Sequence, residues 1–225
     1  MAKVVYFNKG LLKGEIVKSE IIKYEGKDGK DGGEFLSLEV GTGNGNRIKA
    51  TLFPTKSNPN KHTEMLNSYP VGTMVEVVGT VNEKEYESNG RKGIDRSISA
   101  YSIRPLKDGV VSNATFIIQG IVQSIKEVED GVQVKVEFID SYEKDEQVIY
   151  KDPVIFTLEG DVADLIDEND VVKGCNAKFK GKIFNTLEFD DYGDIVGNIQ
   201  MFQIDKIESV IDPDELEDED EELPF

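Results

Sequence analysis

Short runs of alternating apolar and polar residues cover most of the 225-residue chain, and they occur in the same order twice. Val, Ile, Phe, Tyr and Thr dominate these runs, and clusters of Gly, Asn and Asp separate them, which is typical of β-strands joined by turns. The expected strands are 12–24, 34–40, 47–53, 73–84 and 93–103, followed by 115–127, 132–140, 153–158, 175–184 and 194–207. The sequence therefore predicts an all-β chain built from a duplicated unit.

Two short segments without β-patterning stand at equivalent places in the two sets. Lys61–Tyr69 and Gly160–Asp167 each follow the third expected strand, and each could form a short helix. A five-stranded unit of about 100 residues with a helix after the third strand is the plan of the OB fold. We therefore predict two tandem five-stranded OB-type barrels. The alternatives are one β-sandwich of ten strands and two barrels that bind nothing.

Local sequence matches support the duplication. The matched pairs are Lys13–Ser19 with Gln119–Ser124, and Val77–Val81 with Phe179–Ile183. The predicted domains are a first barrel over 1–107, a second barrel over 114–210 and an acidic tail over 211–225, with a linker at Lys107–Asn113. The Asp-Gly and Ser-Asn pairs of this linker favour turns.

The net charge of −18 is unevenly distributed along the chain. Residues 1–110 have 17 Lys and Arg against 14 Asp and Glu, a net of +3, whereas residues 111–210 have 9 against 21, a net of −12. Residues 211–225 have nine acidic residues and no basic ones. The binding of a nucleic acid is largely electrostatic, because the phosphates are negatively charged. A nucleic-acid-binding surface would therefore belong mainly to the first barrel.

Other features of the composition exclude several classes of protein. No apolar run is long enough for a membrane span, and the first residues lack the features of a signal peptide. The single cysteine, Cys175, cannot form an internal disulfide, and we expect it to be buried and unreactive. These features favour a soluble protein of a reducing compartment.

Strands two and three of the first barrel separate an apolar face from a mixed one, because alternate side chains of a strand share a face. The apolar face contains Leu36, Leu38 and Val40, and Ile48, Ala50 and Leu52. The opposite face contains Phe35, Ser37 and Glu39, and Arg47, Lys49, Thr51 and Phe53. OB folds bind oligonucleotides across these two strands, and sites for single strands need rings that stack on bases and cations that follow the backbone.

The flanking loops add rings and cations to this face. Lys23–Gly33 is rich in glycine, and Tyr86–Lys92 is a hairpin tip with Asn89-Gly90 as its turn. The predicted residues that bind single-stranded DNA are Tyr24, Lys27, Lys30, Phe35, Arg47, Lys49, Phe53, Lys56, Tyr86, Arg91, Lys92 and Arg96. The alternative is that the lysines are ordinary surface residues and that a loop or the second barrel covers Phe35 and Phe53.

The second barrel is a weaker candidate for DNA binding. Its second strand turns Gln133, Lys135, Glu137 and Ile139 outward, without a ring. Lys178, Lys180 and Lys182 share one face of its fourth strand, where they could extend a DNA track or serve in packing or protein contacts. The surrounding net charge argues against a strong site.

The chain ends in an acidic run followed by an apolar tip. From Asp212 onward the chain has nine acids in fourteen residues and no base, so this tail should repel itself and stay disordered, but a purely solvating tail has no use for Leu223, Pro224 and Phe225. These three residues predict a docking peptide whose ring and leucine fill an apolar pocket on a partner.

This ending resembles the acidic tail and the Ile-Pro-Phe or Leu-Pro-Phe type tip of bacterial single-stranded DNA-binding proteins, and several bacteriophage proteins of that function end similarly. The resemblance implies that the tip recruits replication, recombination and repair proteins, and that Asp214–Glu222 compete internally for the DNA groove. It implies a cytoplasmic location, in the bacterial host if the chain is phage-encoded. The bacterial type has one OB fold per chain and commonly a stacking Trp. This chain is expected to have two barrels and has no Trp, so a virus-encoded tandem-barrel relative fits better.

Two other functions compete with this interpretation. A metal-dependent nuclease would need ligands, but we expect His62 to lie on the surface and Asp190, Asp191 and Asp194 to form a solvated turn. The glycine-rich stretch Gly41–Asn46 has no helix after it and is interpreted as a hairpin loop, not a phosphate loop. We predict no catalytic residues, no metal and no cofactor. An acidic protein-interaction adaptor or DNA mimic remains the alternative.

Overall fold

The computed structural model describes residues 3–26, 32–88, 91–107, 109–129, 131–144, 147–189 and 195–216, and within 85–93, 142–147 and 187–199 it describes the backbone alone. Strands make up most of the chain, so the all-β class is confirmed. No helix among the described residues is long and apolar enough to cross a membrane.

Contacts divide the chain into two compact units that are not continuous in sequence. The first-barrel unit contains Lys9–Phe116 and Lys182–Met201. The second-barrel unit contains Met1–Asn8, Ile117–Gly181 and Phe202–Phe225. The division into domains at 1–107, 114–210 and 211–225 stays a prediction.

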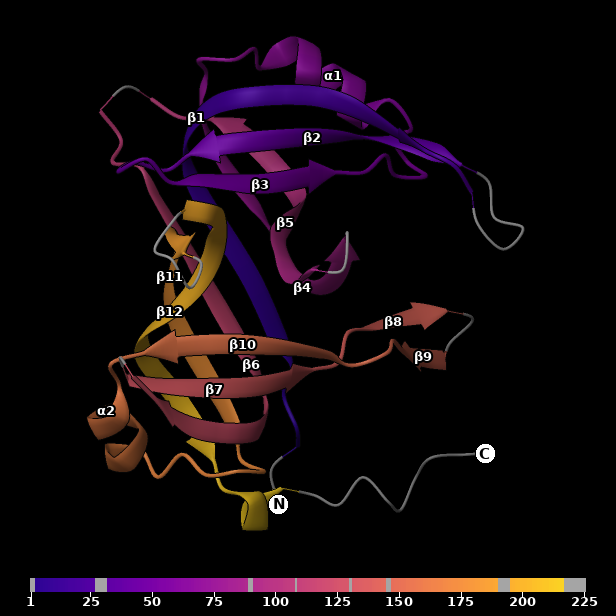
Figure 1. Cartoon of the computed structure of the whole chain (residues 1–225). Coiled ribbons are helices and arrows are strands. Elements are labelled where there is room, and N and C mark those ends of the chain that lie inside the picture. The colour runs from indigo at the N-terminus through magenta and orange to yellow at the C-terminus, as the bar shows by residue number, and fades with distance from the viewer. Residues whose placement is uncertain are drawn as a thin grey trace. The chain divides into compact units, whose positions relative to one another are not determined.

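The first-barrel unit closes a five-stranded sheet on itself. Its elements are β1 (Phe7–Tyr24), β2 (Gly33–Gly41), β3 (Arg47–Leu52), α1 (Lys61–Ser68), β4 (Met74–Ser88) and β5 (Arg91–Pro105). Strand β1 pairs antiparallel with both β2 and β4, while β3 pairs antiparallel with β2 and parallel with β5. The resulting order, β1-β2-β3-β5-β4-β1, is a closed barrel (Figure 1). In the sequence, α1 lies between β3 and β4.

The second barrel repeats this order with one insertion. Its elements are β6 (Asn113–Val128), β7 (Gly131–Phe138), β8 (Ser141–Lys144), β9 (Gln147–Tyr150), β10 (Val154–Gly160), α2 (Ala163–Glu168), β11 (Asn176–Phe189) and β12 (Ile195–Ile211). Pairings run β6-β7-β10-β12-β11 and return to β6, with β10 and β12 parallel. The β8–β9 hairpin, inserted between the second and third strands, was not predicted. A 3₁₀ turn at Pro213–Glu215 follows β12.

The first strand of each barrel has a β-bulge at an equivalent position. The register shifts between Ile16 and Lys18 in β1, and between Val122 and Ser124 in β6. A bulge increases the local twist and bends the strand, which helps one strand to pair with two partners in a closed barrel. Two residues before each bulge, a Cβ on Gly14 or Gly120 would lie 2.0 Å from a backbone oxygen, so only glycine fits.

Hydrogen bonds at the two bulges also correspond. The N–H groups of Ile16 and Val122 donate to the carbonyls of Thr73 and Cys175, at 3.0 and 2.9 Å. Their own carbonyls accept from Gly72 and Gly174, at 2.9 and 2.8 Å, and both glycines have φ of +93°. These matching contacts support the internal repeat predicted from the sequence.

The cores contain the side chains that the alternation placed there. In the first barrel, Leu36, Leu38, Val40, Ile48, Ala50 and Leu52 are all buried. In the second barrel, Phe156 lies between Phe138 and Phe202, with ring centroids 6.1 and 6.3 Å away. Cys175 is fully buried, as predicted, and burial raises the pKa of its thiol.

His62 is not on the surface, so that prediction was wrong. Its side chain in α1 is 4% exposed, and its Nε2 lies 3.0 Å from Oε1 of Glu34 in β2. The contact of α1 with β2 turns this polar ring inward, although its polar neighbours in the sequence indicate no burial. The hydrogen bond to His62 lowers the pKa of Glu34.

Candidate nucleic-acid interface

The register between β2 and β3 places the predicted mixed face on one side of the barrel. Leu38 pairs with Ala50 on the core side, so Glu39 pairs with Lys49 on the other side. Arg47 and Lys49 are exposed, and Phe35, Ser37 and Glu39 are half-buried. Thr51 was expected on this face, but it is buried where β3 pairs with Ser99 of β5.

Three rings gather at one end of this face. Phe35 stacks on Phe53 with ring centroids 4.9 Å apart and planes inclined by 29°, and Tyr24 lies 6.2 Å from Phe35. Tyr24 is 45% exposed and Phe53 is 44% exposed, so neither ring is covered by the described residues. We call Tyr24, Phe35 and Phe53 the aromatic platform. Exposed rings of this kind stack on unpaired bases without regard to sequence.

Basic side chains lie on β3, on the same face as the aromatic platform, and in the loop after β3. Nζ of Lys49 lies 3.5 Å from Oδ2 of Asp95. Both side chains are exposed, so solvent weakens this ion pair. Arg47 begins β3, and Lys56 is exposed in the loop beyond it. These residues could contact the phosphates of a strand whose bases lie on the platform.

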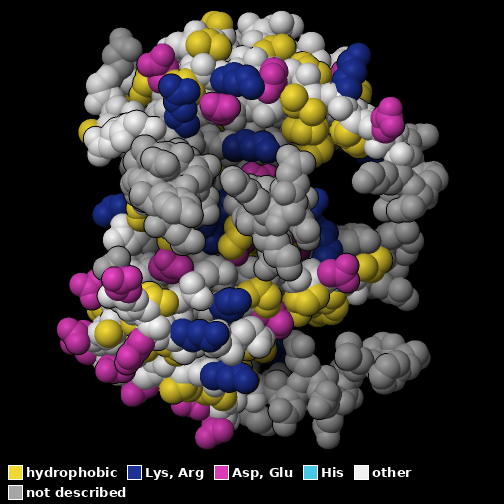
Figure 2. All heavy atoms as spheres, in the orientation of Figure 1, with side chains coloured by type: hydrophobic (Ala, Val, Ile, Leu, Met, Phe, Trp, Pro, Cys, Tyr) yellow, Lys and Arg dark blue, Asp and Glu magenta, His cyan; other side chains and the backbone are white. Residues whose placement is uncertain are grey.

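Carboxylates also line this face, which makes it mixed in charge. Glu39 stands beside Lys49, and Glu20 of β1 pairs with Ser37 in the register and lies 2.8 Å from Lys18. The position of Glu20 was missed in the sequence, because it depends on the β1–β2 register. Figure 2 shows hydrophobic, basic and acidic side chains next to one another over β2 and β3.

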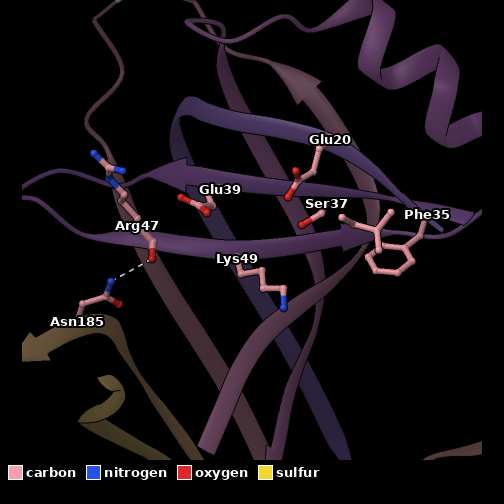
Figure 3. A pocket seen from close by; sticks show the side chains of 8 residues that line it. Glu20, Phe35, Ser37, Glu39, Arg47, Lys49 and Asn185 are labelled. Atoms are coloured by element: carbon pink, nitrogen blue, oxygen red, sulfur yellow. Dashed lines mark hydrogen bonds between the residues drawn. The ribbon is translucent and has the colours of Figure 1, made fainter. Parts of the chain in front are cut away.

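An open pocket of about 580 Å³ lies on this face, entirely within the first-barrel unit. Its lining residues are Glu20, Ile22, Phe35, Ser37, Glu39, Arg47, Lys49 and Asn185. Figure 3 shows Phe35 at one end, Arg47 and Asn185 at the other, and Lys49 between them. Asn185 comes from β11, and no motif in the sequence pointed to it.

Arg96 does not belong to the exposed group. Its side chain is 3% exposed, and its Nε donates to Oε2 of Glu83 at 2.8 Å. Its Nη1 donates to the carbonyl oxygen of Gln200. Because these protein groups occupy the guanidinium, we remove Arg96 from the candidate DNA-binding residues.

Several predicted site residues cannot be placed. Lys27, Lys30, Leu223, Pro224 and Phe225 lie outside the described residues, as do Asn89, Gly90, Asp190, Asp191 and Asp194. Tyr86, Arg91 and Lys92 lie in β4 and β5, but their side chains are not described. Among the described residues, no group of three or more His, Cys, Asp or Glu side chains is placed to hold a metal ion.

The lysine stripe of β11 has nearby protein partners. Lys178 lies 3.0 Å from Oε2 of Glu208, and its Nζ lies 5.6 Å from the ring centroid of Phe7. Lys180 and Lys182 are exposed. Glu208 therefore offsets part of the positive charge of this stripe.

Known proteins show where this fold has been seen before. No protein-family model matches the chain, and no curated protein matches it in sequence. The single-stranded DNA binding protein from Thermus aquaticus has a similar structure, with a TM-score of 0.60 and 14% identity over 92% of this chain and 94% of that one. A deletion mutant of that protein gives a TM-score of 0.56 and 16% identity over 94% and 97%. The chain therefore shares the fold of this bacterial protein over nearly its full length. The match covers both barrels, so the expectation that a tandem arrangement favours a virus-encoded relative over the bacterial type is not supported.

Proposed function

We propose that the chain is a sequence-independent single-stranded DNA-binding protein whose first barrel has the main binding face. The observation that carries this proposal is the aromatic platform at the end of a β2–β3 face that also presents Arg47 and Lys49. The fold shared with the Thermus aquaticus protein supports it.

The chemistry of this face suits unpaired DNA. The platform gives up to three rings for stacking, and base–aromatic stacking is worth roughly 1–3 kcal/mol per base. Arg47 and Lys49 neutralise phosphates and release counterions, which gives an affinity that falls with salt. The carboxylates Glu20 and Glu39 limit the positive potential, so stacking supplies a large share of the binding free energy. No step of this function needs a catalytic group, a metal or a cofactor.

The acidic tail and its tip form the second part of the proposal. Asp214–Glu222 act as a spacer and as a tethered polyanion that competes with DNA, and Leu223, Pro224 and Phe225 recruit replication, recombination and repair proteins. By coating single strands and recruiting these enzymes, the protein protects DNA that is being copied or repaired.

A protein-interaction adaptor or DNA mimic is the second candidate. The net charge of −12 over residues 111–210 and the carboxylates in the pocket favour it. The exposed rings of Tyr24 and Phe53 argue against this candidate. A mimic of DNA presents carboxylates in place of phosphates and needs no stacking surface.

Titration of the full-length chain with oligo-dT over a salt series separates the two candidates. A DNA-binding protein should change its tyrosine fluorescence on binding, with a log–log salt slope of about −0.7 per neutralised phosphate. Duplex DNA should bind more weakly, because its stacked bases cannot reach the platform. Absence of binding to oligo-dT in dilute buffer, with and without the tail, would favour the mimic. Oligo-dU and oligo-rU in parallel test the preference for DNA over RNA.

A further inference from the structure

The outer part of the β11–β12 hairpin, Lys182–Met201, belongs to the first-barrel unit. Among the described residues, hydrogen bonds join each of its two strands to the rest of this unit. Asn185 of β11 contacts the turn between β2 and β3, and the carbonyl oxygen of Gln200 in β12 accepts from Arg96. Of the eight residues that line the pocket, Asn185 alone comes from the second half of the chain.

Asn185 makes two hydrogen bonds at the edge of the candidate DNA-binding face. Its backbone N–H donates to Oδ1 of Asn46 at 3.0 Å. Its Nδ2 donates to the backbone carbonyl of Arg47, also at 3.0 Å, as the dashed line in Figure 3 shows. Asn46 ends the turn and Arg47 begins β3, so the two bonds hold adjacent residues.

The turn that Asn185 contacts has an unusual backbone. Gly43, Asn44 and Gly45 follow one another with φ of +91°, +51° and +79°. Two backbone hydrogen bonds close the turn: the N–H of Thr42 donates to the carbonyl of Asn46 at 3.0 Å, and the N–H of Asn46 donates to the carbonyl of Gly43 at 2.9 Å. Because glycine-rich segments lose much conformational entropy when they become ordered, an outside contact has a large effect on how well this turn is fixed.

The orientation of the Asn185 amide is set by the bond that its Nδ2 makes. Its Oδ1 is buried without a hydrogen-bond partner among the described residues, which is a cost to the fold. Turning the amide over would bring Oδ1 toward the carbonyl oxygen of Arg47, where two acceptors would meet. The donor contact to Arg47 is therefore the interaction that this side chain supplies.

We propose that Asn185 is a positioning residue of the single-stranded DNA site: it fixes the β2–β3 turn and the backbone of Arg47, and thereby presents the Arg47 guanidinium to a phosphate of the bound strand. This inference rests on the proposed function. It assigns the second half of the chain a part in DNA binding by the first barrel, without a contact between Asn185 and DNA.

A double-mutant cycle with the full-length protein and oligo-dT tests this inference. Asn185→Ala should weaken binding by about 3- to 10-fold at low salt and make the salt slope shallower, by up to about 0.7. Arg47→Ala should do the same. Because Asn185 acts through Arg47, adding Asn185→Ala to Arg47→Ala should change the affinity by less than about 2-fold.

Two further variants separate positioning from general folding. Asn82→Ala removes the 2.8 Å bond from Asn82 to Ser99 in the same unit, away from the pocket lining, and should leave DNA binding unchanged. If Asn185→Ala fails to fold by circular dichroism, Asn46→Ala removes the other bond to the hairpin and should show the same dependence on Arg47.

The outcomes are distinct. Unchanged affinity and salt slope in Asn185→Ala would overturn the inference, and so would a full additional loss in the Arg47→Ala background. Failure of the unmodified chain to bind any oligonucleotide would overturn the proposed function and the inference with it.

Discussion

Phe35 and Phe53 stack with their ring centroids 4.9 Å apart, one ring at the start of β2 and the other just after β3. This pair exists because the antiparallel register brings the start of one strand beside the end of the next. Phe53 keeps 44% of its surface exposed, so the stack has a free side that a base can cover.

We predict that Phe53→Ala weakens oligo-dT binding by about 1–3 kcal/mol, the range for loss of one base–aromatic stack. Phe35→Ala should have a similar effect, because Phe35 supports the exposed rings on both sides. Tyr101, which is 55% exposed on β5, is the matched control, and Tyr101→Ala should bind normally. Fluorescence anisotropy measures all three; equal losses for Phe53 and Tyr101 would argue against a defined platform.

The Lys49–Asp95 pair gives a prediction with the opposite sign. Asp95→Asn should tighten DNA binding at low salt, because it removes an acid 3.5 Å from a phosphate-binding lysine. Lys49→Gln should weaken binding and make the log–log salt slope shallower by about 0.7, the value for one phosphate. Affinities at several salt concentrations test both variants. A tighter complex at high salt as well would point to a cause other than charge.

Truncation after Leu216 should tighten oligo-dT binding, most clearly in dilute buffer. This truncation keeps the turn at Pro213–Glu215, in which Asp212 accepts from the N–H of Asp214, and removes the other six acids of the tethered polyanion. Deleting Phe225 alone should leave DNA binding intact and abolish recruitment of partner proteins. An affinity that the truncation leaves unchanged at low salt would remove the proposed competition.

Arg96→Ala should destabilise the fold by about 3–5 kcal/mol, because it removes the cation that pairs with the buried carboxylate of Glu83. Denaturation by urea measures this change. The double variant Arg96→Leu with Glu83→Gln should recover much of the loss, since no buried charge then remains unpaired. A loss below about 1 kcal/mol in Arg96→Ala would indicate that water reaches the pair.

The contact between Glu34 and His62 should make the stability of the fold depend on pH. The pKa of Glu34 is lowered from its ordinary value of 4.5, so its contribution to stability is present above that pH and is lost as the pH falls through the lower folded pKa. Glu34→Gln should therefore reduce stability at neutral pH and flatten its decline below pH 4.5. Thermal melting across this range checks the prediction.

Much of the fold was predictable because β-strands with one buried face leave a period of two in the sequence. Leu36, Leu38 and Val40 alternate with polar or aromatic residues, and the structure buries them. The β8–β9 hairpin left no comparable signal, because it is short and forms a separate two-stranded sheet with Val148 and Tyr150 exposed. A pattern that depends on burial gives little signal where side chains such as Val148 and Tyr150 are exposed.

The residues of the site were predictable only where a strand's alternation determined them. Phe35 and Lys49 follow from that alternation. The burial of Arg96 and the position of Asn185 depend on contacts with residues more than 100 positions away, Gln200 and Asn46, and no local pattern encodes such contacts. His62 was misplaced for the same reason, because its partner Glu34 lies on another element.

Photo-crosslinking of the full-length protein to bromodeoxyuridine oligonucleotides tests the proposed DNA-binding face most directly. We predict that mass spectrometry will find crosslinks in peptides containing Tyr24, Phe35 and Phe53, and that these will disappear when excess oligo-dT competes. Crosslinks confined to the second barrel, with none on β2 or β3, would contradict the assignment of the main single-stranded DNA site to the first barrel.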